Sequence, residues 1–510
     1  MKRGDIFRRI PRPNIQKSNF DMGFDHRTTF DMGYLVPVLL EETLPGDSWN
    51  LSCEPFVRAA ALIAPVMSRI DVRIDYFHVS NRILWPSWER WFKNELINKP
   101  PYVVINDSEP NTVKHGTLGD YLGLPAFKSL NNYVGNEVSA FPVAAYNFIW
   151  NEFYRHQHVQ NEKAYELTND DNTSTFLPFL LGKPEFRNWR HDYFTSANPY
   201  PVSGAAGVQI PITHQAATTT VRKITDQSAV VNETAFNTDG NGALRENTTN
   251  IQVYHDAVHN APIEDLRRAI KVQEWLEKLL TGGTRFREML WSFFGVDNKD
   301  MRMQVPEHIG SHVQSLKISE VLTTGESRNS EGNLINPVGQ MAGHGVSVGK
   351  TPRFKFFARE NGWILGLMSV QPKPTYLNQG IPKKFLRDDI YKYYFPQFAH
   401  LGEQPIENRE LFIDDTEVNQ SNVFGYQANY AEYKFRNNRV SGEFGDNLDF
   451  WTFARKFVQT PTLDETFIKA SVGVGPFAVK DGSNNLRAMV YHDNRVVRPI
   501  PRFSVSKTGG

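Results

Sequence analysis

In the stretch RIDVRIDYFHVS, residues 69–80, apolar and charged residues alternate from Arg69 to Tyr76. Side chains of a β-strand point to opposite faces with a period of two, so this pattern predicts a strand with one face in a core. The second face, which includes Arg73 and Asp75, is expected to face water or a neighbouring polar surface and to pair opposite charges across strands. The pattern favours an antiparallel sheet.

Two further segments have the pattern of β-hairpins. RFKFFARENGWILGLMSV, residues 353–370, alternates, turns at Asn-Gly and returns as a continuous apolar run, which predicts a second strand buried on both faces. FGYQANYAEYKFRNNRVSGEF, residues 424–444, predicts another pair of strands joined near Asn437 and Asn438. Two sheets packed face to face would accommodate both hairpins.

Four segments have apolar residues at helical spacing. The predicted helices span residues 85–96, residues 144–162, a segment from Pro262 to Gly282, and a segment that carries Phe286 to Phe293. Trp85, Trp88 and Trp91 form a stripe on the first of them. This stripe is typical of a helix packed on a sheet, and the alternative is a platform on which unpaired bases stack.

The segment from residue 203 to residue 253 departs from the rest of the chain, because Phe236 is its only aromatic residue whereas the whole chain is 13% aromatic. Such a segment cannot build a core by itself, so we expect an insertion exposed to solvent. Within it, FNTDGNGALR has turn residues suited to a projecting hairpin tip. The residues of this tip are Thr238, Asp239, Gly240, Asn241 and Gly242.

Charge is balanced over the 510 residues, with 56 Lys and Arg against 56 Asp and Glu, so no overall field attracts nucleic acid or membrane. Both ends are nevertheless basic, over residues 1–20 and 487–510. Flexible basic arms neutralise phosphates without sequence readout, and the alternative is a pair of solvated termini. The candidate nucleic-acid-binding residues are Lys2, Arg3, Arg8, Arg9, Arg12, Lys17, Arg498 and Arg502.

A single cysteine, Cys53, excludes an intramolecular disulfide and a cysteine-based zinc cluster, and it is consistent with assembly in a reducing compartment. The chain has no apolar run that suits a signal peptide or a membrane span. We therefore expect neither secretion by that route nor membrane insertion.

One motif argues for metal chemistry. His156, His158 and Glu162 have the HxHx(3)E spacing of cupins, so the alternative function is a metal-dependent, cupin-like β-sandwich enzyme. The residues around them have helical periodicity, which directs side chains at positions i and i+2 to different sides and keeps the ligands apart. We therefore expect surface or interface histidines, no metal, no cofactor and no catalytic residue.

Several long motifs occur in an order that resembles one virus family. These are FDMGYLVPVLLEETLPGDSW, RIDVRIDYFHVSNRILWPSWERW, AYNFIWNEFYR, WRHDYFTSANPYP, TRFREMLWSFFGVDNKDMRMQVPEHIGS, FGYQANYAEYKFRNNRVSGEF and DFWTFARKF. Together they resemble the major capsid proteins of the gokushoviruses, a branch of the Microviridae, which are small icosahedral bacteriophages with single-stranded DNA. The resemblance covers nearly the whole chain outside residues 203–253.

This resemblance implies a mainly β fold, an eight-stranded antiparallel jelly-roll β-sandwich with long loop insertions and a few short α-helices. It implies a structural protein of the virion that self-assembles into a T=1-type icosahedral shell around a circular single-stranded DNA genome. The implied partners are further copies of the chain, the genome, a DNA pilot protein, an internal scaffolding protein and a bacterial surface receptor. Assembly would take place in the cytoplasm of the host bacterium, without membrane insertion.

The resemblance and the composition together predict five regions. They are a basic arm at 1–20, the first part of the shell domain at 21–202, an exposed insertion at 203–253 that would protrude at the threefold axes and contact the host surface, the second part of the shell domain at 254–486, and a basic tail at 487–510.

Overall fold

The computed structural model divides the chain into two compact units, one formed by Met1–Pro199 with Asp297–Gly510 and the other by Tyr200–Val296. The residues that it describes are 15–105, 112–126, 136–201, 221–226, 229–231, 251–253, 263–282, 292–293, 304–322, 324, 327–328, 334–336, 339, 341–377, 379–399, 402–413, 422–479, 482 and 484–503.

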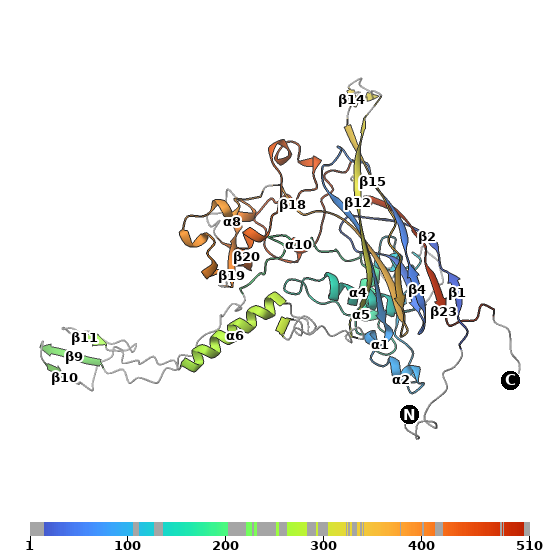
Figure 1. Ribbon diagram of the computed structural model, residues 1–510, viewed down its shortest axis with the longest axis horizontal. Helices are drawn as coiled ribbons and strands as arrows, with labels where there is room; N and C mark the ends of the chain where they lie inside the picture. Colours follow the sequence, from blue (N-terminus) through green and yellow to red (C-terminus); the bar gives the residue numbers. More distant parts are fainter. Residues whose placement is uncertain are drawn as a thin grey trace. The chain divides into compact units, whose positions relative to one another are not determined.

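An antiparallel sheet of eight strands dominates the first unit (Figure 1). Its strands, from one edge to the other, are β2 (Phe24–Phe30), β22 (Leu486–His492), β5 (Cys53–Ala59), β15 (Met341–Val348), β12 (Glu307–Leu322), β6 (Ile70–Ser80), β17 (Gly362–Pro372) and β3 (Val36–Thr43). The two edge strands, β2 and β3, follow one another in the chain. The sheet is therefore nearly closed, which confirms the predicted mainly β, jelly-roll type of fold.

Four strands of this sheet continue along the chain into a second, smaller sheet. A second sheet consists of β1 (Ser18–Asp21), β23 (Arg495–Arg498), β4 (Ser48–Leu51) and β16 (Phe354–Phe357), in that order. Each of these strands lies next along the chain to its counterpart in the order β2, β22, β5, β15. Short breaks separate the two sets, as at Ser52 between β4 and β5. Four strands of the eight-stranded sheet are thus followed or preceded, after a short break, by a strand of the second sheet.

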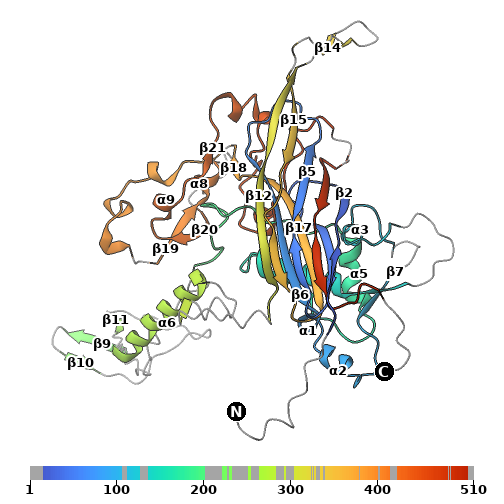
Figure 2. The same cartoon turned by 45° about the vertical axis from the view of Figure 1, so that its right-hand side comes forward.

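The central strand β12 joins the two halves of the eight-stranded sheet, because it pairs with one strand of each half. Its first part, from Glu307 to Leu316, pairs with β6, and its second part, from Lys317 to Leu322, pairs with β15. Figure 2 shows the long strands β12, β15, β6 and β17 side by side. A register shift near Gly310 marks a β-bulge in the first part.

The main core lies on the inner face of these strands, where apolar residues recur at a period of two. On β6 the inner residues are Ile70, Val72, Ile74 and Tyr76, all of which are buried. On β22 they are Leu486, Ala488 and Val490. The alternation in the sequence thus predicted the core face of β6 correctly.

A second core covers the other face of β6 and β17, because helices pack there (Figure 1). These are α1 (Asn81–Leu84), α4 (Phe141–Ile149), the π-helix η1 (Trp150–Tyr154) and α5 (Thr173–Leu181). Leu365 and Leu367 of β17 are fully buried against them, so the prediction that this strand is buried on both faces is confirmed. The hairpin predicted at residues 353–370 is wrong, however, because β16 pairs with β4 whereas β17 pairs with β3 and β6. Trp85 is also fully buried in this core, and Trp88 of α2 (Trp88–Phe92) is partly buried.

A third apolar cluster joins residues 193–197 to the segment between residues 376 and 468. This part contains the antiparallel pair β19 (Glu403–Glu407) and β20 (Val423–Ala428) and the parallel pair β18 (Thr375–Tyr376) and β21 (Asn438–Arg439). The predicted hairpin at 424–444 is therefore wrong. The chain leaves β20 through Tyr430, whose φ of 59° is left-handed, and then forms a short helix.

Shorter elements complete the first unit. They are β7 (Tyr102–Ile105), α3 (Leu118–Tyr121), β8 (Asn136–Ser139), β13 (Ser327–Arg328), β14 (Leu334–Asn336), η3 (Lys383–Phe385), η4 (Ile390–Lys392), η5 (Pro396–Phe398), α8 (Asn408–Leu411), α9 (Ala431–Lys434), η6 (Gly442–Gly445), η7 (Asp449–Trp451) and α10 (Glu465–Ile468).

The second unit contains a small sheet of β10 (Ala229–Val231), β9 (Val221–Asp226) and β11 (Ile251–Val253), and the helix α6 (Ile263–Gly282). The helix predicted between Pro262 and Gly282 is confirmed by α6. The helix predicted from Phe286 to Phe293 lies mostly outside the described residues, although Trp275 of α6 stacks on Phe293 with ring centroids 5.7 Å apart.

Candidate nucleic-acid interface

The two basic ends of the chain start from neighbouring strands. β1 and β23 pair in antiparallel register, and Ser18 lies opposite Arg498. Lys17 therefore precedes one strand at the same end at which Arg498 completes the other. The predicted C-terminal tail begins inside β22 and runs through β23, so its first residues belong to the sheet.

Arg498 is held in place by several partners. Its guanidinium donates to Asp47 Oδ2 at 3.1 Å and to the carbonyl oxygen of Glu42 at 2.5 Å, and it lies 5.0 Å from the ring centroid of Trp49. Asp47 is fully buried. The charge of Arg498 is thus compensated within the fold, and this residue fixes the origin of the C-terminal tail.

Lys17 and Arg502 are exposed at the start of the two arms. Lys17 Nζ lies 3.5 Å from the carbonyl oxygen of Gly46 and 6.0 Å from the ring centroid of Phe357. Lys2, Arg3, Arg8, Arg9 and Arg12 lie outside the described residues. The same holds for the predicted surface-contact residues Thr238, Asp239, Gly240, Asn241 and Gly242.

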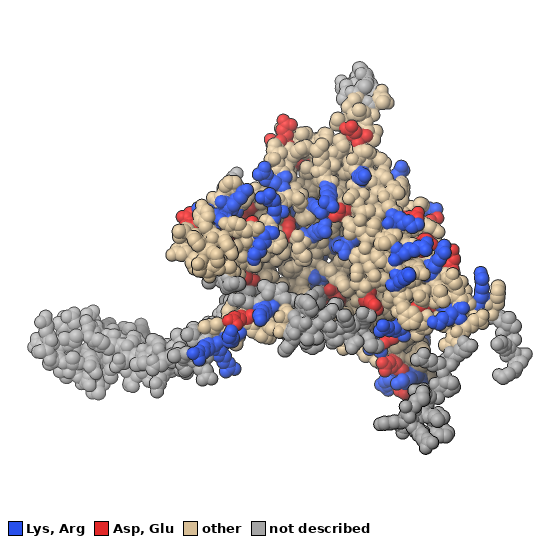
Figure 3. Space-filling model, viewed as in Figure 1, with Lys and Arg blue, Asp and Glu red and all other residues tan. Residues whose placement is uncertain are grey.

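Further basic residues gather on the outer face of β2, β22 and β5, which the sequence did not single out. Arg487 of β22 lies directly opposite Arg58 of β5 and, on its other side, opposite Thr29 of β2. Arg27 lies on the same face of β2. Figure 3 shows Lys and Arg side chains in a column over this part of the sheet. We call Arg27, Arg58 and Arg487, with Phe56, Met489 and Tyr491, the arginine face.

A cleft of about 780 Å³ borders the arginine face. Its lining includes all three arginines and Lys183, and its carboxylates are those of Asp31 and Asp120. Both carboxylates already accept backbone hydrogen bonds, Asp31 from Asn485 at 2.9 Å and Asp120 from Gly116 at 2.9 Å. Because its lining has four Lys and Arg side chains against these two carboxylates, the cleft is predominantly cationic.

The predicted metal motif does not converge. The helix expected to reach Glu162 ends at Tyr154, so His156 and His158 lie in the turn that follows, with ring centroids 6.1 Å apart. Glu162 instead accepts a hydrogen bond from Arg155 at 2.8 Å. Burial, together with the neighbouring imidazoles, lowers the pKa of His156 to about 4. Among the described residues, no group of three or more His, Cys, Asp or Glu side chains could hold a metal ion.

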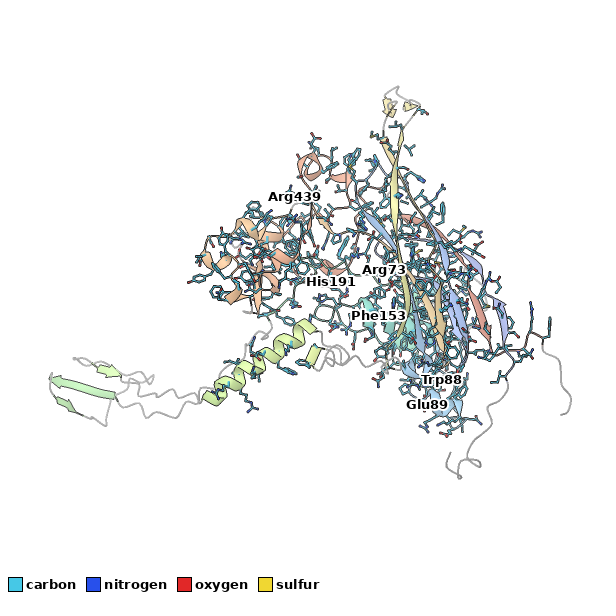
Figure 4. The ribbon with its side chains drawn as sticks, in the orientation of Figure 1. Arg73, Trp88, Glu89, Phe153, His191 and Arg439 are labelled. Carbon is cyan, nitrogen blue, oxygen red and sulfur yellow. The ribbon has the colours of Figure 1, made fainter. Side chains whose placement is uncertain are left out.

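The charged face of β6 was expected to meet water or a polar neighbour, and for Asp75 this expectation is wrong. Its carboxylate is buried and accepts hydrogen bonds from Arg73 Nε and from the hydroxyl of Tyr154, both at 2.8 Å, with Arg187 at 3.8 Å. Figure 4 labels Arg73 on the sheet. The opposite charges pair along one strand, two residues apart, and the carboxylate of Asp75 is buried whereas the side chain of Arg73 is partly exposed.

No helix in the described part of the chain combines the length and the apolar composition that crossing a bilayer requires.

Comparison with known proteins points to one family of capsid proteins over nearly the full length of the chain. The family model described as "Capsid protein (F protein)" matches residues 9–508. Two relatives named capsid protein VP1 come from Bdellovibrio phage phiMH2K and Chlamydia phage 1 and are 30% and 29% identical to this chain. The alignments cover 99% and 98% of this chain and 98% and 97% of those relatives, respectively. A third, capsid protein VP1 of Spiroplasma virus 4, is 28% identical over 97% of this chain and 95% of its own length.

Proposed function

Because this chain belongs to the Capsid protein (F protein) family, we propose that its copies close into a small icosahedral, T=1-type shell around a circular single-stranded DNA genome. The protein is a structural component of the virion and not an enzyme. The resemblance to gokushovirus capsid proteins that the sequence motifs predicted is confirmed by the family match and the VP1 relatives. The match from end to end is the observation that carries the function.

An exposed aromatic surface supports self-assembly. Phe385 and Tyr391 have exposed fractions of 71% and 66%, and Tyr393, Tyr394 and Tyr433 are each about half exposed. Soluble monomers rarely present so many large apolar side chains in one short segment, whereas protein interfaces are enriched in aromatic residues. In this proposal a neighbouring copy of the chain covers this surface in the shell.

The basic arms supply the contacts with the genome in this proposal. Lys17 and Arg502 stand at the start of arms that leave adjacent strands, so both arms can reach the same region of DNA. Phosphate neutralisation by such arms needs no base readout and weakens as salt rises. In this proposal the chain has the five regions predicted from its sequence, and the two parts of the shell domain, residues 21–202 and 254–486, lie between the arms.

The remaining partners belong to the same proposal. A DNA pilot protein and an internal scaffolding protein join the shell, assembly takes place in the cytoplasm of the host bacterium, and the tip from Thr238 to Gly242 contacts a receptor on the host surface. Exchange of residues 203–253 between relatives tests the last point. Host range and adsorption should follow the exchanged segment, and unchanged host range would remove the role.

Assembly itself is tested by electron microscopy of the purified chain, supplied with circular single-stranded DNA and scaffolding protein. Closed particles of uniform size are expected. Replacement of Phe385 and Tyr391 by Ser should leave a folded subunit that assembles poorly, because it removes apolar interface area. Replacement of the exposed Phe503 by Ser, outside that surface, is the control. Wild-type protein that stays monomeric under these conditions would count against the proposal.

A further inference from the structure

We propose that the arginine face and its cleft form a binding site for single-stranded DNA on the folded body of the protein, apart from the arm segments that precede β1 and follow β23. The inference rests on the proposed function, since it takes the enclosed genome as the ligand. The arms were inferred from charge at the ends of the chain. This site arises only from the pairing of β2, β22 and β5.

The first argument is the unfavourable pairing of Arg58 with Arg487. The two residues lie directly opposite one another on the exposed face, and like charges in that position destabilise a sheet. No ion pair joins either arginine to a carboxylate within the described part of the chain. An anion between the two guanidinium groups would relieve the repulsion. Arginine suits phosphate in particular, because its planar fork can donate two parallel hydrogen bonds.

The second argument is that nearby acidic residues do not neutralise the site. Among the described residues, Arg27 has Asp25 as its one ion-pair partner, at 3.8 Å and with both side chains exposed, and such pairs contribute little. Glu54, which lies on β5 and faces outward with Arg58, is engaged by Lys350 at 2.6 Å. The cleft itself is lined by four Lys and Arg side chains against two carboxylates, so a net positive charge remains for a ligand.

The third argument is the presence of rings among the cations. Phe56 lies opposite Met489 in the sheet, and the guanidinium of Arg58 is 5.5 Å from the ring centroid of Phe56. Tyr491 is exposed two residues further along β22, between Asp25 of β2 and Glu54 of β5. The partly exposed ring of Phe56 beside Arg58 suits single strands, whose unpaired bases stack on aromatic side chains while their phosphates meet arginine. Duplex DNA offers no free base faces, so the site favours single strands.

The fourth argument concerns room and continuity. The cleft of about 780 Å³ is within the usual range for small-ligand sites, so an unstacked nucleotide fits it. The strands that carry the face also continue into the arms, because β2 follows β1 and β22 precedes β23. A DNA strand held by the arms thus meets the arginine face on the same layer of the protein.

The experiment uses the full chain and a fluorescent deoxythymidine 20-mer, with binding followed by anisotropy at several salt concentrations. The test variant carries Arg58→Gln and Arg487→Gln. The control carries Arg267→Gln and Arg268→Gln, which removes the same charge from exposed positions on α6. The test variant should bind at least about tenfold more weakly, with a log K against log salt slope that is smaller in magnitude by about 1.4, which is the value for two lost phosphate contacts.

Equal affinity and slope in the test and control variants would overturn the inference. A second measurement needs no variant. Photo-crosslinking of the wild-type chain to a 20-mer that contains bromodeoxyuridine should label the strands that carry Phe56 and Tyr491, as mass spectrometry can locate. Crosslinks confined to the arms would also overturn it. Failure of the shell to assemble, seen by electron microscopy, would refute the proposed function without changing where the crosslinks fall, so the two failures can be distinguished.

Discussion

The buried carboxylate of Asp75 provides a quantitative test of how the sheet and the helical layer are joined. Tyr154 of η1 donates its hydroxyl proton to this carboxylate at 2.8 Å, and Arg73 donates to it from the same strand. Burial and the nearby negative charge raise the pKa of Tyr154 well above its ordinary value, so the hydroxyl remains a donor. One hydrogen bond between buried groups thus links a strand to a helix.

Replacement of Tyr154 by Phe removes this bond with little change in shape. A hydrogen bond to a charged group contributes about 1.5–3 kcal/mol, so the free energy of unfolding should fall by about 2 kcal/mol. In an Asp75→Asn background the same replacement removes only a neutral hydrogen bond, worth about 1 kcal/mol. The two changes should therefore be coupled by about 1 kcal/mol. Asp75→Asn alone should cost about 3 kcal/mol, because it leaves the largely buried Arg187 without its charge partner.

The measurement is urea unfolding of the isolated subunit, followed by tryptophan fluorescence after reversibility has been checked. Hydrogen exchange of the β6 amides gives a local value. Tyr193→Phe is the matched control, because the hydroxyl of Tyr193 also donates to a buried carboxylate, that of Glu410 at 3.0 Å. Its cost should simply add to that of Asp75→Asn. Equal costs of Tyr154→Phe in both backgrounds would refute the reasoning.

Three further predictions concern other buried positions. Arg498→Gln should lower the free energy of unfolding by about 3 kcal/mol, because Asp47 is left buried without its charge partner. Arg502→Gln, the control, should have almost no effect. Thermal melts compare the two variants, and equal melting temperatures would contradict the expectation. Burial lowers the pKa of His78 and of His492 to about 4. The unfolded chain binds more protons than the folded chain between about pH 6.5 and pH 4, so stability is complete above that window and falls through it by up to about 3 kcal/mol per histidine. His492→Phe should flatten this pH dependence in melts, and an unchanged profile would exclude His492 as a cause. Gly310→Ala should cost about 1–3 kcal/mol, since a Cβ there would lie 2.2 Å from the ring of Phe354; a second change, Phe354→Ala, should then reduce the cost of Gly310→Ala, and no such rescue would argue against the clash.

Patterns that repeat within one element made the sheet predictable. The alternation in β6 identified its core face, and the continuous apolar run of β17 identified a strand covered on both sides. The error at residues 424–444 has a different origin, because local sequence does not reveal which strand a segment pairs with. There β20 pairs with β19, which comes earlier in the chain.

The end of a helix can also depend on distant residues. Apolar periodicity continues to residue 162, yet the helix ends at Tyr154. Asn188 donates to the carbonyl oxygen of Tyr154 at 2.7 Å, and Gln160 accepts from the backbone N–H of His156 at 2.8 Å. These contacts satisfy the polar groups that a longer helix would have bonded, and no local pattern announces them.

The candidate interface was likewise predictable from the sequence only in part. Charge at the two ends of the chain was visible in the sequence and predicted the arms. Arg58, in contrast, lies in a distant strand, and Arg487 stood out only as the first residue of the basic tail. The register of β5 against β22 makes the two neighbours. Sequence alone could not have identified the arginine face, because it depends on pairing between distant segments.

The way in which the two arms leave the fold also determines how it bears mechanical load. Within the described part of the chain β1 is an edge strand that pairs with β23 alone, and the arms depart from the same end of this antiparallel pair. Tension on the N-terminal arm alone acts on the hydrogen bonds between β1 and β23. Tension on both arms in one direction pulls the pair as a unit and shifts the stress to the ladder between β23 and β4. A polymer bound to both arms therefore loads the hydrogen bonds between β23 and β4 inside the sheet, and it does not first separate the edge strand β1.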